Sequence, residues 1–340
     1  MYNRVFGVPF DPPSSPERLN IKLAYARHLL ETLRNEEGFA DPYDSIYSEF
    51  QEGNFLYDDL TWVGKVPVDS WLKPKPSVAD MDLLKPVQVA SFLRANGCWQ
   101  YALRVAEFVS KEILPHRPVM IGIDHSSTGG VLLALTSQYS DLNLIVLDAH
   151  FDVLKKNGLP PSFDSLTKSG KQKFYHCGNF LSVLLEKGLI NPTNLWILGV
   201  AEHNLYGPEP NSGTRAAISG EEDIRRWIDK GVNIVTDKMV SSGEFSLDLS
   251  GPSYLSIDMD VGSLSSIFSA RFMNSIGLKL PEFLDLLTRV KNAILASAFP
   301  LVGMDIVEVD IHFLETIDLT PHQDFTKHIF QRALETMLGE

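Results

Sequence analysis

The stretch Leu147-Asp148-Ala149-His150-Phe151-Asp152 decides how the chain is interpreted, because an apolar run ends there in three residues that can bind metals. The run of residues 142–147 is short and mostly apolar, which predicts a buried strand. Spacing by two then places Asp148, His150 and Asp152 on one side of an extended segment. The stretch therefore predicts a metal site at the end of a strand.

Two further segments have the same design, Ile121-Gly122-Ile123-Asp124-His125-Ser126 and Ser256-Ile257-Asp258-Met259-Asp260. Each lies at the carboxyl end of an apolar run, where open parallel sheets place their ligand sites. Together the three segments supply four carboxylates and two imidazoles as candidate metal ligands, which are His125, Asp148, His150, Asp152, Asp258 and Asp260.

So many carboxylates without Lys or Arg partners would repel one another, so the cluster makes sense mainly around cations. Asp and His ligands without cysteine favour Mn²⁺ or Zn²⁺. Four carboxylates are more than one catalytic zinc normally takes, and two neighbouring ions fit the set better. An isolated Asp-x-Asp is more often a solvated turn, but three such segments in order favour metal binding.

Outward from these segments, the chain alternates short apolar runs with helical patterns, which predicts an α/β fold with a parallel sheet covered by helices. Strands are expected at residues 5–9, 119–123, 142–147, 195–200, 232–236, 254–258 and 302–309. Helices are expected at residues 19–33, 86–113, 130–139, 179–185, 280–296 and 321–337, and from a capping box at Ser219 to Asp229. Residues 1–340 are interpreted as one domain, with an irregular elaboration at about 35–85 that holds one strand near 62–68.

Composition limits the function classes. The 340 residues carry a net charge of −13 and are 44% hydrophobic. This composition argues against a disordered chain and against sequence-independent nucleic-acid binding. No apolar run approaches the roughly 18 residues of a membrane helix, and no secretory signal is visible. Two cysteines, Cys98 and Cys177, suit a reducing cytoplasm.

The motifs resemble those of the ureohydrolases, the family of arginase, agmatinase and formiminoglutamase. Residues 122–126 match its Gly-Gly-Asp-His-Ser motif with Ile123 in place of the second Gly. Residues 148–152 match Asp-Ala-His-x-Asp, and residues 256–260 match Ser-x-Asp-x-Asp. Residues 7–11 and 305–308 also resemble the family's first and last strands, so the likeness runs from about residue 5 to 309.

The resemblance implies a three-layer α/β/α fold and a dinuclear manganese centre in each subunit, although the ligand set would also tolerate Zn²⁺ or Ni²⁺. The residues implied for one ion are His125, Asp148, Asp152 and Asp258. Those implied for the other are Asp148, His150, Asp258 and Asp260. Oligomers are frequent in the family, so a homo-oligomer is an open expectation.

Catalytic and substrate-binding residues are also implied. Asp260 would accept a hydrogen bond from the attacking water, and His176 looks like the family's proton-shuttling loop histidine, with a surface loop residue as the alternative. Glu308 matches the carboxylate that pairs with the guanidinium-like end of the substrate. We expect no protein cation beside it, because a buried unpaired carboxylate suggests that a ligand completes the pair.

The loop after Asp260 departs from the family pattern. Arg271 introduces a cation near the expected mouth of the site, where it would either hold a substrate carboxylate or serve as an ordinary packing residue. The leading interpretation is a hydrolase of linear C–N bonds in a small guanidino, amidino or formimino compound, releasing urea or a related product. A deacetylase-like amide hydrolase with one zinc, and a metal-binding scaffold without turnover, stay open as alternatives.

Overall fold

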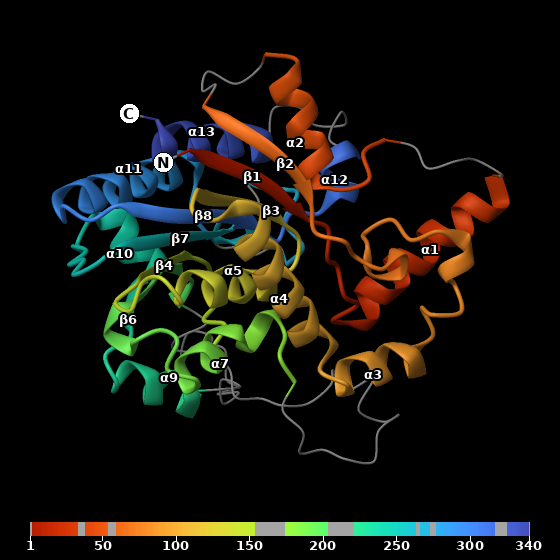
Figure 1. Ribbon diagram of the computed structural model, residues 1–340, viewed down its shortest axis with the longest axis horizontal. Helices are drawn as coiled ribbons and strands as arrows, with labels where there is room; N and C mark the ends of the chain where they lie inside the picture. The colour runs from red at the N-terminus through yellow and green to blue at the C-terminus, as the bar shows by residue number, and fades with distance from the viewer. Residues whose placement is uncertain are drawn as a thin grey trace, which may run out of the picture.

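Eight parallel strands form one sheet in the computed structural model, in the order β2-β1-β3-β8-β7-β4-β5-β6 (Figure 1). The structure describes residues 2–32, 38–53, 59–153, 174–202, 221–262, 266–272, 277–316 and 325–339. The strands are β1 (Asn3–Val8), β2 (Leu60–Lys65), β3 (Arg117–Gly122), β4 (Asn143–Leu147), β5 (Leu195–Val200), β6 (Asn233–Thr236), β7 (Ser253–Asp258) and β8 (Leu301–Val307).

Helices cover both faces of the sheet. They are α1 (Pro16–Thr32), α2 (Pro42–Gln51), α3 (Pro86–Arg94), α4 (Gly97–Phe108), α5 (Thr128–Leu135), α7 (Phe180–Glu186), α9 (Glu221–Ile228), α10 (Asp237–Ser242), α11 (Leu280–Ala296), α12 (Ile311–Thr316) and α13 (Thr326–Leu338). Figure 1 shows α4 beside α5 and α11 beside α13, and both pairs are in contact.

The alternation of side chains along each strand divides the core in two. In β4, Leu144 and Val146 pack with residues of α3, α4, α5, α7 and α9. Ile145 and Leu147 point to the other face and pack with residues of α2, α10, α11 and α13. The strand is apolar on both faces because both are covered, as parallel sheets require. The predicted three-layer α/β/α fold is confirmed.

The main differences from the expected elements lie before β3. Residues 35–85 hold β2 close to its expected place and also an unforeseen helix, α2. Pro42 occupies the first turn of α2, and the Asp41 side chain caps it by accepting the backbone N–H of Asp44. The single helix expected at 86–113 is interrupted between α3 and α4, because Asn96 adopts a left-handed φ of 58°. The capping residue Ser219 and residues 321–324 lie outside the described residues.

The order of the four central strands, β3-β8-β7-β4, positions the site. Leu147 pairs with Ile257, and Asp258 pairs with Val307, so the polar residues that follow these strands come out at nearly the same level. The carboxyl ends of β3, β4, β7 and β8 therefore meet along one edge, although they are far apart in the chain. Within the described residues, no helix is both long and apolar enough to cross a membrane.

Candidate metal centre

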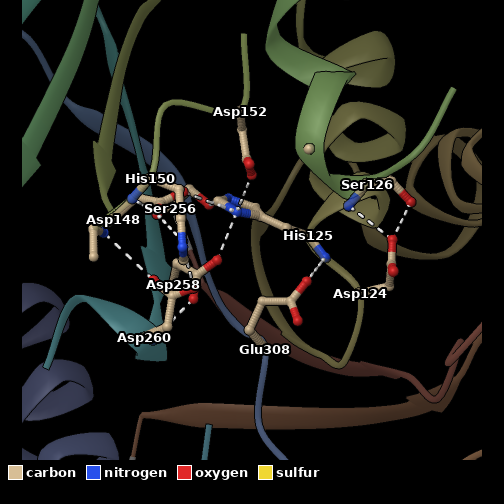
Figure 2. A network of polar contacts seen from close by, with 12 residues as sticks. Asp124, His125, Ser126, Asp148, His150, Asp152, Ser256, Asp258, Asp260 and Glu308 are labelled. Carbon is tan, nitrogen blue, oxygen red and sulfur yellow. Dashed lines mark hydrogen bonds and ion pairs between the residues drawn. The ribbon is translucent and has the colours of Figure 1, made fainter. Parts of the chain in front are cut away.

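The six side chains predicted to bind metal come together at this edge of the sheet (Figure 2). Their candidate ligand atoms form two groups, and within each group all of these atoms lie within 4.8 Å of one another. The first group is His125, Asp148, Asp152 and Asp258, and the second is Asp148, His150 and Asp260.

The first group is centred on the ring of His125, directly after β3. Its Nδ1 lies 2.9 Å from an oxygen of Asp258, 3.1 Å from Asp152 and 3.5 Å from Asp148. In Figure 2 the carboxylates of Asp152 and Asp258 both point at this nitrogen. The ring is fully buried and packs against the ring of Phe180, with centroids 4.5 Å apart. These four ligand residues are the ones that the resemblance implies for one ion.

The second group shares Asp148 with the first. His150 Nδ1 lies 2.8 Å from an oxygen of Asp260 and 3.5 Å from the other oxygen of Asp148. Asp258, which the resemblance also assigns to this ion, falls only in the first group, and its second oxygen accepts the backbone N–H of Asp260 at 2.9 Å. The side chain of His150 is 38% exposed, whereas that of His125 is fully buried. The cluster therefore opens to solvent on the side of His150.

The hydrogen bonds around His125 leave the correct nitrogen for a metal. Ser256 donates its hydroxyl hydrogen to Asp305 at 2.6 Å, so its oxygen accepts from His125 Nε2, 3.0 Å away. With the proton on Nε2, the lone pair of a neutral ring lies on Nδ1, facing the carboxylates. His125 Nδ1 and Asp148 Oδ2, 3.5 Å apart, are among the buried side-chain atoms that have no hydrogen-bond partner within the described residues. Two orphaned ligand atoms facing one point fit a cation.

The pKa values of the clustered side chains also indicate a site that favours bound positive charge. Burial by itself lowers the pKa of His125, but contacts with Asp148, Asp152 and Asp258 outweigh it and hold that pKa well above its ordinary value. Burial, followed by repulsion from Asp148, raises the pKa of Asp152 to about 6. Burial raises the pKa of Asp260 to about 7 against the attraction of His150. Crowded carboxylates thus hold protons when no metal neutralises them.

His176 begins a short 3₁₀ helix, η5 (Cys177–Asn179), that lies against η4 (His125–Ser127). Its Nδ1 accepts the backbone N–H of Gly178 at 3.1 Å, and its own N–H donates to the Asn179 side chain at 2.9 Å. The side chain is half-buried, and burial lowers its pKa. His176 is therefore a half-buried residue with a defined hydrogen-bonding role beside the candidate site.

Tyr175 anchors this segment beside the candidate ligand cluster. Its hydroxyl donates to the backbone oxygen of Ser126, and its N–H donates to the Asn96 side chain at 3.0 Å. A Cβ on Gly129 would come within 2.0 Å of the Tyr175 hydroxyl, so the close approach requires glycine. The contact fixes the residue next to His176 against the start of α5.

Glu308 directly follows β8 and turns the chain with a left-handed φ of 59°. Its carboxylate accepts the backbone N–H of His125 at 2.8 Å, as Figure 2 shows. Burial raises the pKa of Glu308 to about 8 against the opposing charge of Arg271. Non-glycine residues adopt this backbone conformation rarely, and such strain clusters at functional sites.

The expectation that Glu308 has no protein cation is wrong. Arg271 Nη1 lies 3.1 Å from Glu308, and the Arg271 side chain is fully buried. The guanidinium also contacts Asp11 and Asp124, each at 2.9 Å. Arg271 does not stand at an open mouth, because three carboxylates hold it inside the protein. Of its two expected roles, the structure therefore favours internal packing over a grip on a substrate carboxylate.

Several neighbours of the site were missed from the sequence. Asp124 and Ser256 belong to the sequence motifs, but no role was predicted for either. Asp11 and Asp305 belong to segments that resemble the family's first and last strands, and again no role was predicted. Their partners are far away in the chain, so spacing carries no signal of the pairing. A third group of candidate ligands, Asp124, Cys177 and Glu308, lies beside the first two. Arg271 already neutralises its two carboxylates.

Comparison with known proteins relates the chain to one family, both in sequence and in fold. The family model described as the arginase family matches residues 39–320. No curated protein is similar enough in sequence to match the chain. Among solved structures, arginase from Bacillus subtilis subsp. subtilis str. 168 is 16% identical with a TM-score of 0.57, over 100% of this chain and 99% of that chain.

Two further structures have the same fold. Formimidoylglutamase from the same Bacillus subtilis strain is 18% identical with a TM-score of 0.56, over 99% of this chain and 87% of that chain. The agmatine ureohydrolase of Thermoplasma volcanium is 17% identical with a TM-score of 0.50, over 99% and 90%. At these identities the likeness shows a shared fold.

Proposed function

This chain belongs to the arginase family, whose members are hydrolases of non-peptide C–N bonds, and from that premise we propose that it is a dinuclear-manganese hydrolase of a linear C–N bond in a small guanidino, amidino or formimino compound. The observation that carries the proposal is the pair of ligand groups that share Asp148. One buried carboxylate with an oxygen toward each group suits two ions held close together.

The proposed ligands are those of the two groups, with His125, Asp152 and Asp258 on one side and His150 and Asp260 on the other. Divalent ions held by these residues would supply a bound water of lowered pKa, which would be a nucleophile at neutral pH. The oxygen ligands and imidazoles suit Mn²⁺, and also tolerate Zn²⁺ or Ni²⁺.

The chain's own residues would orient and move protons. We assign Asp260 to accept a hydrogen bond from the attacking water, because its carboxylate lies on the exposed His150 side of the cluster. His176 would protonate the leaving nitrogen, since its Nδ1 is occupied by Gly178 and its Nε2 edge is left for proton transfer. Glu308 would face the substrate from beside His125.

The alternatives differ in metal content and turnover. A deacetylase-like enzyme would hold one zinc, whereas two His and four Asp residues favour two ions. A metal-binding scaffold without turnover would require a closed pocket, whereas the ligand cluster opens to solvent on the side of His150. A cytoplasmic location is part of the proposal, because the two cysteines of the chain suit a reducing compartment.

The test is a screen for urea and ammonia release by the Mn²⁺-loaded protein over guanidino, formimino and ureido compounds, with metal content measured on the same preparation. The Asp148→Ala variant is the matched control, because a contaminating hydrolase would not respond to it. Two bound ions with no turnover of any compound would favour the scaffold.

A further inference from the structure

The carboxylate of Glu308 is already paired with a cation of the protein itself. Oε1 accepts from the backbone N–H of His125 at 2.8 Å and lies 3.3 Å from Arg271 Nη1. Oε2 accepts from the same Nη1 at 3.1 Å. A guanidinium or amidinium group recognises a carboxylate through two parallel hydrogen bonds, which need both oxygens. Both oxygens are already in use.

Backbone hydrogen bonds fix the position of Arg271. Its backbone N–H donates to the carbonyl oxygen of Glu308 at 2.8 Å, and Asp310 donates in turn to Ser269 at 2.8 Å. An antiparallel bridge joins Ala270 and Val309 between these two bonds. Residues 269–271 thus run as a short antiparallel strip beside residues 308–310, which fixes Arg271 opposite Glu308.

The other contacts of the guanidinium tie it down further. Asp11 and Asp124 each lie 2.9 Å away, and the carbonyl of Pro12 accepts from Nη2 at 3.3 Å. Asp11 would keep Lys22 at 3.3 Å if the guanidinium moved away, but Asp124 and Glu308 would lose the cation that compensates them, which is strongly unfavourable. The positive charge is therefore a permanent part of the wall beside the first ligand group.

We infer that Arg271 takes the place of a substrate cation opposite Glu308, so that the group presented to the metal centre is neutral, a ureido or carboxamide group, and not a guanidinium. The inference rests on the proposed hydrolytic function, keeps the linear C–N bond, and replaces the cationic guanidino or amidino group of the substrate with a neutral one. A substrate cation would meet the fixed charge of Arg271 and find no free carboxylate, and juxtaposed like charges suppress binding strongly. The chemistry is unchanged: water forms the new C–O bond, the C–N bond breaks, and the leaving nitrogen takes the proton from water.

The test compares matched pairs that differ only in this charge. The probes are butylguanidinium and butylurea, 4-guanidinobutanoate and 4-ureidobutanoate, and 4-guanidinobutylamine and 4-ureidobutylamine, each with the Mn²⁺-loaded protein. We expect kcat/KM to favour the ureido member of at least one pair by on the order of 100-fold. A guanidino member that is hydrolysed as well as its partner overturns the inference and leaves the hydrolase proposal standing.

Binding decides the matter where no pair turns over, which would count against the proposed function. Calorimetry on the Mn²⁺-loaded protein should then show tighter binding of the ureido member. Equal binding, tighter binding of the cation, or no binding of either member overturns the inference.

Two variants test whether Arg271 is the cause. Arg271→Lys keeps the charge and should keep the preference for the neutral member, whereas Arg271→Gln should shift it toward the cation by about 10-fold or more. If Arg271→Gln does not fold, Glu308→Gln gives the answer, because it removes the carboxylate charge that would pair with a substrate cation. The preference for the ureido member should then be at least as large, and a smaller one contradicts the inference.

Discussion

His125 and Ser256 lie 3.0 Å apart, ring Nε2 to hydroxyl oxygen, and this contact determines which ring nitrogen faces the carboxylate cluster. Asp305 accepts the Ser256 hydroxyl hydrogen at 2.6 Å and the Tyr254 hydroxyl at 2.6 Å. A buried chain of hydrogen bonds from β7 and β8 thus orients a ligand that follows β3. Partners of this kind hold a metal-binding histidine in one tautomer.

Ser256→Ala should therefore weaken metal binding while leaving all six candidate ligands in place. Loss of such a partner typically lowers metal affinity by about 10- to 100-fold. Titration of Mn²⁺ into the metal-free protein measures the effect. Ser256→Thr keeps the hydroxyl and is the matched control, so equal losses in the two variants would show that packing, and not the hydrogen bond, is responsible.

The metal content should be close to two equivalents after Mn²⁺ loading and gel filtration. Chelation should lower the melting temperature, because ion removal leaves buried carboxylates crowded together. Asp260→Ala should reduce the content toward one equivalent, whereas Asp82→Ala, at a carboxylate that is 88% exposed, should leave it unchanged. One equivalent in the unaltered protein, unaffected by Asp260→Ala, would contradict a dinuclear site.

Asp148 and Asp152 should differ in their effect on that content. Asp148 belongs to both ligand groups, so Asp148→Ala should remove both ions. Asp152 belongs to the first group alone, and Asp152→Ala should leave a partly loaded protein. Elemental analysis separates these results, and a fully loaded Asp148→Ala protein would show that the grouping is wrong.

The sequence predicted that the candidate metal ligands come together, because their geometry is local. A strand places residues two apart on one side, and parallel strands end at one edge, so three motifs sufficed to bring His125, Asp148 and Asp258 together. The pairing of Arg271 with Glu308 could not be predicted in this way. It depends on the antiparallel bridge between Ala270 and Val309, which has no signature in residue spacing.

The missed helix α2 is a different case, because its signal was present. Asp41 followed by Pro42 is an N-cap and first-turn pair, and it was outweighed by the glycines and aromatics scattered through residues 35–85. The break at Asn96 shows the opposite error. A continuous apolar period over 86–113 concealed a left-handed residue that redirects the chain before α4.

Arg271→Met should be strongly destabilising, since it leaves the buried carboxylates of Asp124 and Glu308 without the cation that they share. Breaking a buried pair in this way costs about 3–5 kcal/mol of unfolding free energy. Denaturant unfolding of the metal-loaded protein measures it. Arg332→Met is the control, because that side chain is 46% exposed and its pair with Glu335 should contribute about 1 kcal/mol or less. An equal loss of unfolding free energy in the two variants would mean that Arg271 contributes no more to stability than an exposed ion pair does.

His176→Asn separates the proposed proton transfer from the structural role of the same residue. The Asn side chain can still accept the N–H of Gly178 and cap η5, so the fold and the metal content should be kept. The variant lacks the imidazole, and turnover should fall by about 10²- to 10⁴-fold, as for other positioned acids and bases.

Burial holds the pKa of His176 below its ordinary 6.5, so the ring is neutral at pH 7 and gains a proton only as the pH falls through that lowered value. The imidazolium is the proton donor in this proposal, so kcat/KM should rise as the pH falls through that lowered value in the unaltered protein, and the rise should be absent from His176→Asn. Unchanged turnover in a fully loaded His176→Asn protein would remove His176 from the chemistry and leave it as the cap of η5.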